Sequence, residues 1–190
     1  MRKAHLVDLT PYCNSFAATF DADRAAGVMN AWGNSFPAEE LPLGAAFVAD
    51  GFPFQLPPKR VGHWDHVEAL GQTIQIEGSP VVSEIALLCC GEMGDQKVEI
   101  EAHAEDGQSE TITVATRGWL VPGDTAIEGA AFRSSHLHYV GDYELALLTP
   151  ALWTARQELR RPMPLSELRL GRNPLFHIFG LTLSEVSAGA

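Results

Sequence analysis

Two histidines separated by one residue are the side chains best suited to metal chemistry. In His136-Leu137-His138 both imidazoles lie on the same face if the segment is extended. Such a pair can chelate Zn²⁺, and Asp142 or His103 could supply a third ligand. Because the sequence fixes no third ligand, we expect these histidines to be surface or hydrogen-bonding residues, with metal absent or adventitious. A small metal-dependent hydrolase or isomerase that uses His136 and His138 is one alternative function.

A second cluster, His63-Trp64-Asp65-His66, combines an aromatic ring with polar groups. A Trp on a loop can stack on the C–H face of a sugar, while a carboxylate and an imidazole bind its hydroxyls. The cluster therefore predicts a carbohydrate ligand in contact with Trp64 and Asp65. In the structural alternative, Trp64 caps the core and Asp65 caps a turn.

The other tryptophans differ in their surroundings. Trp32 lies in Asn30-Ala31-Trp32-Gly33-Asn34, which is too polar and too rich in glycine for a core segment. It is therefore a further ligand-binding candidate, whereas Trp119 and Trp153 fit the core or its rim.

No sequence motif identifies a catalytic residue. The chain has no G-x-S-x-G, H-E-x-x-H, Walker A or dinucleotide fingerprint. Ser134 or Ser135 beside His136 resembles a nucleophile with its base, but no third group is placed to orient the pair. We therefore expect a non-catalytic protein that needs no cofactor.

Short strand-like segments must position these side chains. They alternate with Gly, Pro and Asp turns, and long helical periodicity is missing. This pattern predicts one domain over residues 1–190, an all-β, antiparallel β-sandwich of jelly-roll type with short helical turns. The strands are expected at residues 4–9, 45–49, 73–76, 82–90, 98–104, 110–115, 143–148 and 176–183. The helical turns are expected at residues 23–30, 38–41 and 165–168.

Two strand regions allow finer predictions. A three-residue loop that ends at Gly107 would pair Ile100 with Ile112 and keep the apolar side chains on one face. A two-residue turn would mix the faces, so we expect the three-residue loop. The segment 82–90 is apolar on both faces over its second half, which indicates a central strand covered on both sides.

Charge and composition restrict the partners. The formal net charge is −11, with 13 basic residues among 190. A nucleic acid partner would need clustered Lys and Arg, and an anionic membrane surface is disfavoured for the same reason. No segment has the length and apolarity of a membrane span.

Cysteine content and the N-terminal sequence bear on the compartment. The first residues carry no apolar run typical of a signal peptide, and the three cysteines are Cys13, Cys89 and Cys90. An odd number cannot pair completely, and adjacent cysteines rarely bridge each other. We therefore expect reduced thiols and a cytoplasmic location.

Several short blocks run from the first expected strand to the last. They are Val7-Asp8-Leu9 with Tyr12 and Asn14, Ser35-Phe36-Pro37-Ala38-Glu39-Glu40-Leu41-Pro42, Gly71-Gln72-Thr73-Ile74, Phe132-Arg133-Ser134, and Phe176-His177-Ile178-Phe179-Gly180-Leu181-Thr182-Leu183. These blocks resemble the β-sandwich accessory modules found with bacterial glycoside hydrolases. The resemblance implies a sandwich fold and a sugar-binding role for Asp21, which follows Phe20 in a matched loop, and for Asp65, Arg133 and His138. At Asp65 the family usually has an Asp-Asn pair, and His66 replaces the Asn here.

The function predicted from these observations is a non-catalytic carbohydrate-binding module. Its ligand would meet a loop face built from residues 20–42, 59–68 and 132–143. A structural or protein-interaction domain that forms a homodimer is the alternative from a different class. The ligand-binding candidates are Asp21, Trp32, Trp64, Asp65, Arg133 and His138.

Overall fold

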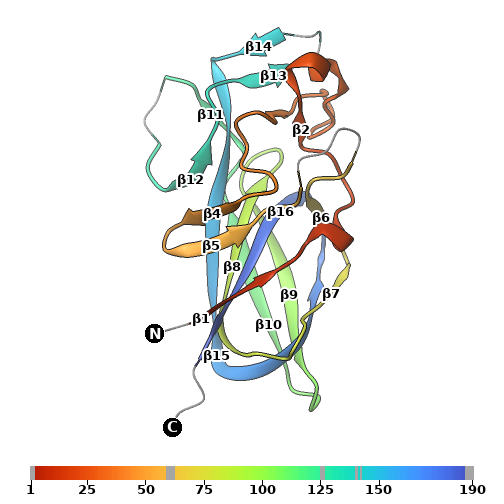
Figure 1. Cartoon of the computed structure of the whole chain (residues 1–190), viewed down its shortest axis with the longest axis vertical. Coiled ribbons are helices and arrows are strands. Elements are labelled where there is room, and N and C mark those ends of the chain that lie inside the picture. The colour runs from red at the N-terminus through yellow and green to blue at the C-terminus, as the bar shows by residue number, and fades with distance from the viewer. Residues whose placement is uncertain (1–2, 59–62, 125–126, 140, 142, 187–190) are drawn as a thin grey trace.

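Antiparallel strands form most of the molecule (Figure 1). The computed structural model describes residues 3–58, 63–124, 127–139, 141 and 143–186. Its main sheet contains β1 (Lys3–Val7), β6 (Val67–Leu70), β7 (Thr73–Gln75), β8 (Val81–Gly91), β9 (Gln96–Ala104), β10 (Ser109–Thr116), β11 (Leu120–Pro122), β12 (Ala130–Arg133), β15 (Leu148–Leu170) and β16 (Arg172–Glu185). The remaining strands pair as β2 (Ala18–Thr19) with β3 (Phe36–Pro37), β4 (Ala46–Ala49) with β5 (Phe52–Gln55), and β13 (Leu137–Tyr139) with β14 (Tyr143–Leu145). Two 3₁₀ helices, η1 (Thr10–Tyr12) and η2 (Asp21–Ala26), complete the described elements.

The long strand β15 joins the two layers of the sandwich. Its first half pairs with β8, from Trp153 opposite Cys89 to Glu158 opposite Glu84. After a register shift between Glu158 and Met163, its last residues pair with β9 and β7. In Figure 1 the strand follows the long axis and curves at the lower end. One layer thus contains β1, β16, β8 and the start of β15, and the other contains β10, β9, the end of β15 and β7.

Side chains pack on both faces of the layer that contains β8. Ile85, Leu87 and Cys89 belong to the core that also includes Ile100 and Ile112 of the other layer. The alternate residues Ala86, Leu88 and Cys90 belong to a second core, which also contains Phe36, Phe54, Leu137 and Phe179. The predicted two-sided burial of this strand is confirmed, as is the predicted all-β, antiparallel β-sandwich with short helical turns.

The β9–β10 hairpin has the predicted register. Ile100 lies opposite Ile112 and Val98 lies opposite Val114. Gly107 has a φ of +85° and its N–H donates to the carbonyl of Ala104, which closes the three-residue loop. A side chain there would be strained, because the left-handed region disfavours a Cβ.

The expected helical turns need correction. Residues 165–168 form part of β15, and a register shift between Leu165 and Glu167 brings Leu165 and Leu168 into the same core. The bulge thereby mimics the three-residue spacing of a helix. The turn expected at 23–30 is the earlier η2, interrupted at Asp23 by a non-helical conformation, and residues 38–40 form only a turn.

The cysteines agree with the sequence analysis. Cys13, Cys89 and Cys90 are free and buried. Burial is the main cause that raises the pKa of the Cys13 and Cys89 thiols to about 12. Within the described ranges, no helix has the length and apolar character needed to cross a membrane.

Replacement of a side chain in the second core should destabilise the fold strongly. Leu88 is fully buried, so we expect Leu88→Ala to lower the free energy of unfolding by about 2–5 kcal/mol through lost burial and a residual cavity. Leu147→Ala is the matched control, because this leucine is 78% exposed and its truncation should change stability by less than about 0.5 kcal/mol. Urea denaturation followed by circular dichroism measures both, and equal losses would contradict the two-core arrangement.

Candidate functional site

A polar cluster lies where β13, β2 and η2 meet, at the upper end of the molecule in Figure 1. A bridge between Ser35 and His138 holds β13 in place, with each backbone N–H donating to the other residue's carbonyl at 3.0 and 3.1 Å. Between the two histidines, Leu137 is buried in the second core. The strand alternation therefore turns His136 and His138 away from that core, toward the loops.

His138 is fully buried and uses both ring nitrogens. Its Nδ1 lies 2.9 Å from Thr19 Oγ1, and its Nε2 lies 3.2 Å from Asp21 Oδ1. Thr19 Oγ1 in turn lies 2.6 Å from Ser35 Oγ. In the neutral ring a proton on Nε2 is donated to Asp21, and Nδ1 accepts from Thr19.

His136 is held from one side only. Its Nδ1 lies 3.2 Å from Glu40 Oε1 and 2.8 Å from Ser135 Oγ, while the Ser135 N–H donates to Glu40 Oε2 at 2.6 Å. A proton on Nδ1 faces the Glu40 carboxylate, which leaves a lone pair on Nε2. That Nε2 is buried and has no hydrogen-bond partner among the described residues.

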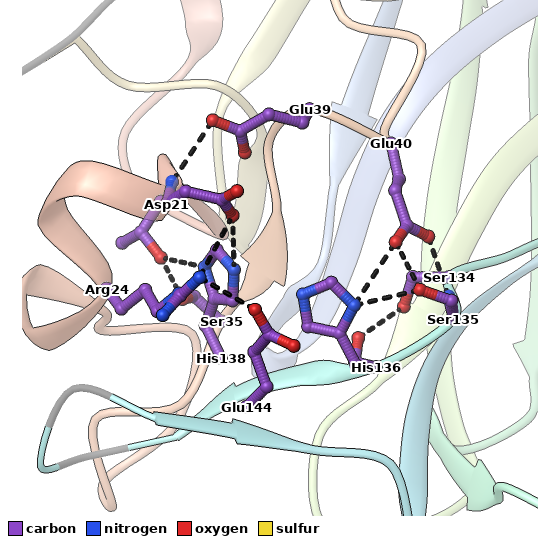
Figure 2. A network of polar contacts seen from close by, with 11 residues as sticks. Asp21, Arg24, Ser35, Glu39, Glu40, Ser134, Ser135, His136, His138 and Glu144 are labelled. Carbon is purple, nitrogen blue, oxygen red and sulfur yellow. Dashed lines mark hydrogen bonds and ion pairs between the residues drawn. The ribbon is translucent and has the colours of Figure 1, made fainter.

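Three potential metal ligands converge at this cluster. Donor atoms of Asp21, His136 and His138 all lie within 4.8 Å of one another, and the two ring centroids are 5.2 Å apart. Figure 2 shows both imidazoles between Asp21 and Arg24 of η2 on one side and Glu40, Ser134 and Ser135 on the other. Two imidazole nitrogens and a carboxylate oxygen are a ligand set that suits Zn²⁺.

Most charged groups around the cluster are acidic. The Asp21 N–H donates to Glu39 Oε1 at 3.1 Å, and Arg24 donates to Glu144 Oε1 at 2.7 Å. Arg24 also lies 3.7 Å from Asp21 Oδ1. Burial lowers the pKa of His138, and a positive charge on His136 would lower it further, whereas Asp21 acts in the opposite direction. A neutral imidazole beside carboxylates is the form that a metal cation needs.

Comparison with known families identifies the fold but no ligand. The profile of the AziU2-like β-sandwich domain matches residues 3–187. The chain belongs to this family. The match supports the sandwich fold implied by the resemblance described above, and it carries no link to glycoside hydrolases. No curated protein is similar enough to the chain to be counted as a relative.

Two of the sugar-binding candidates have clear structural contacts in this AziU2-like domain. Asp65 is buried, and its carboxylate oxygens accept from the N–H groups of Ala17 and Ala18 at 2.8 and 2.9 Å. Arg133 donates to Thr149 Oγ1 at 2.8 Å and to the carbonyls of Pro122 and Gly123, both at 2.7 Å. Asp65 thus fixes β2, and Arg133 braces β12 against β11 and β15.

The tryptophans divide as the sequence suggested. Trp32 and Trp64 are 56% and 55% exposed, whereas Trp119 and Trp153 are buried. Of the candidate third ligands, His103 lies on β9 with its Nε2 3.1 Å from Glu101. Asp142 lies outside the described residues.

Sequence reasoning missed several residues of the site. No motif or spacing in the sequence marks Arg24 and Glu144 as residues of the site. Glu40 lies in one of the blocks that resemble the accessory modules, but its pairing with Ser135 and His136 comes from the fold. Asp21 was expected to bind a sugar, and its position next to His136 and His138 was not predicted.

A second pair of histidines is buried near β6. His66 Nε2 lies 3.0 Å from His177 Nδ1, and His66 Nδ1 lies 2.9 Å from Asp65 Oδ1. Burial is the main cause that lowers the pKa of His177, and the nearby Glu92 acts against it. The folded chain therefore favours the neutral form of His177.

Acid should destabilise the chain through the buried His177. Unfolding restores an ordinary histidine pKa of about 6.5, so below that pH the unfolded state binds more protons than the folded state and stability falls. We expect the urea midpoint to fall between about pH 7 and pH 5, and His177→Gln to reduce this slope. The control is His103→Gln on β9, which should retain the slope. Identical slopes in wild type and His177→Gln would contradict the assignment.

Proposed function

We propose that this domain binds a divalent metal ion, Zn²⁺ by ligand type, through Asp21, His136 and His138, and acts as a metal-dependent hydrolase. The observation that carries the proposal is the buried Nε2 of His136, which has no hydrogen-bond partner in the described part of the chain and stands beside His138 and Asp21. A buried acceptor without a partner is costly, and a metal ion would satisfy it.

The neighbours of both histidines support metal binding. Glu40 and Ser135 contact Nδ1 of His136, and Thr19 contacts Nδ1 of His138. Such contacts on the far nitrogen fix the ring orientation and the tautomer of metal-binding histidines. On metal binding the proton of His138 would move from Nε2 to Nδ1 and be donated to Thr19, so that both Nε2 atoms would have lone pairs available for an ion.

The number of ligands favours catalysis over a purely structural role. Catalytic zinc sites use three protein ligands and keep a position open for water or substrate, whereas structural sites are closed by four. The side chain of Asp21 is 55% exposed, so a substrate can approach from its side. Arg24, within 3.7 Å of Asp21, is placed to hold a negatively charged group of the substrate.

The geometry gives little support to a serine nucleophile. Ser135 Oγ and Glu40 both contact Nδ1 of His136, so serine and acid compete for one nitrogen. In a Ser-His-Asp triad the serine and the acid use opposite nitrogens of the ring. Because Ser135 contacts Nδ1 of His136 and not its Nε2, the Nε2 atom is better suited to bind a metal ion than to act as the base of a serine nucleophile.

Loss of one ligand should remove bound metal. After incubation with Zn²⁺ and dialysis, we expect His136→Ala to retain about one zinc ion per chain fewer than the wild type, because catalytic zinc needs three protein ligands. Asp21→Asn should weaken binding too, while His103→Ala is the matched control and should bind as the wild type. Elemental analysis by plasma mass spectrometry gives the stoichiometry, and equal zinc contents in wild type and His136→Ala would refute the proposal.

Cobalt replacement tests the open coordination position separately. Acetohydroxamate should change the visible spectrum of the Co²⁺-loaded protein, because it can replace water on an ion with three protein ligands. This change should be lost in His136→Ala.

Carbohydrate binding is a second candidate, favoured by the exposure of Trp32 and Trp64. Two indole rings more than half exposed offer apolar faces that a sugar could cover. This function needs no metal and no reaction.

Sugar binding should depend on these rings. Affinity for a matching sugar should be micromolar to millimolar, about −4 to −8 kcal/mol. Trp64→Ala or Trp32→Ala should weaken it by at least about 1 kcal/mol without unfolding the domain. Leu147→Ala is the control for loss of another exposed apolar side chain. Calorimetric titration with neutral and acidic sugars measures the affinity, and a complete absence of heat would leave the metal proposal alone.

A further inference from the structure

The buried pair His66 and His177 joins two strands that lie side by side. His66 directly precedes β6, and His177 lies on β16 opposite Glu68 of β6. The His66 ring stacks on Phe179, with centroids 5.0 Å apart and planes 12° from parallel. Both histidines are almost completely buried.

The two neutral histidines have too few N–H groups to satisfy every polar contact around them. If the Asp65 carboxylate accepts from Nδ1–H of His66, then Nε2 of His66 accepts from Nδ1–H of His177. This series of hydrogen bonds ends at Nε2 of His177. That atom is buried and has no hydrogen-bond partner among the residues that the structure describes. Its nearest acidic group is Glu92, with Oε2 at 3.8 Å. A lone pair that faces a carboxylate in a buried place is unfavourable.

We propose that His66, His177 and Glu68 form a second, buried site for a divalent metal ion, Zn²⁺ by ligand type, with His66 Nε2 and His177 Nδ1 as its nitrogen ligands. Donor atoms of the three residues lie within 4.8 Å of one another. The facing nitrogens are 3.0 Å apart, and two nitrogens on a tetrahedral zinc ion lie about 3.3 Å apart. The two nitrogens therefore have to separate by only about 0.3 Å, and both rings have to tilt so that their lone pairs converge on the ion.

Metal binding would remove the unfavourable lone pair of His177. With an ion on Nδ1 of His177, its Nε2 would carry the proton and present it to Glu92 Oε2, at 3.8 Å, in place of a lone pair. Nδ1–H of His66 continues to donate to Asp65 at 2.9 Å. Each histidine would then have a carboxylate on its far nitrogen, the arrangement that commonly orients metal-binding histidines.

The competing explanation is a proton shared between the two histidines. A shared proton would place a positive charge in the interior, and burial opposes that charge at His177. A metal ion would bring a larger charge, but it would form direct bonds to two nitrogens and to the Glu68 carboxylate. These bonds would offset the free-energy cost of burying the charge. Glu92 and Asp65 add two further negative groups around it.

The test uses His136→Ala as the background, because that variant lacks a ligand of the first site, formed by Asp21, His136 and His138 (the loop site). We expect it to retain about one zinc ion per chain after dialysis, as a site with three or more protein ligands should. In this background, Glu68→Gln should weaken zinc binding at least about tenfold, measured by competition with a chromophoric chelator, and His177→Ala should abolish it. Glu101→Gln on β9 is the matched control and should leave the affinity unchanged. Circular dichroism confirms that each variant is folded.

The possible outcomes separate this proposal from the first one. If His136→Ala binds no zinc while the wild type binds one ion, the loop site stands and the buried site is refuted. If both bind the same single ion and Glu68→Gln weakens it, the buried site stands and the loop site is refuted. Zinc affinity unchanged by Glu68→Gln in the His136→Ala background overturns the buried site, even if His177→Ala is too unstable to measure.

Discussion

Burial on both faces of the layer containing β8 is the constraint on which the rest of the structure depends. One face packs against the other layer of the sandwich. The side chains of β8 on that face, such as Ile85 and Leu87, must therefore be apolar. The opposite face packs against the loop segments through Leu88, Phe36 and Leu137. The loops thereby have a core of their own, and the buried Leu137 anchors the segment that carries both histidines of the loop site. A precise arrangement of polar side chains can rest on segments with little regular structure only because their apolar neighbours are buried.

The Asp65 carboxylate connects the two histidine clusters. It accepts from the backbone of Ala17 and Ala18, and Thr19 on the same short strand contacts His138. It also contacts His66, the first member of the buried pair. A change in the charge at His66 would therefore act on the residue that holds β2 in place. The polar network that orients one site is in this way an extension of the network that orients the other.

The sequence predicted what depends on local alternation and missed what depends on distant contacts. The β9–β10 register follows from keeping Ile100 and Ile112 on one face, and the structure has it. The long β15 was missed because a bulge near Leu165 breaks the alternation and imitates a helical spacing. Neither cluster could be assembled from spacing, since 117 residues separate Asp21 from His138 and 111 separate His66 from His177. The sequence marked His136, His138 and Asp21 as separate candidates, but only the fold brings such distant residues together.

The types of side chain in both clusters restrict the chemistry further. Neither group of potential metal ligands contains a cysteine, and burial raises the pKa of the Cys89 thiol to about 12. The potential ligands are therefore imidazole and carboxylate, which suit borderline metals better than soft ones. Each imidazole must be neutral to bind, and burial keeps the pKa of His138 and of His177 low. The burial that makes these histidines poor bases thus leaves their lone pairs available at neutral pH, and a metal ion competes with fewer protons than it would at an exposed histidine.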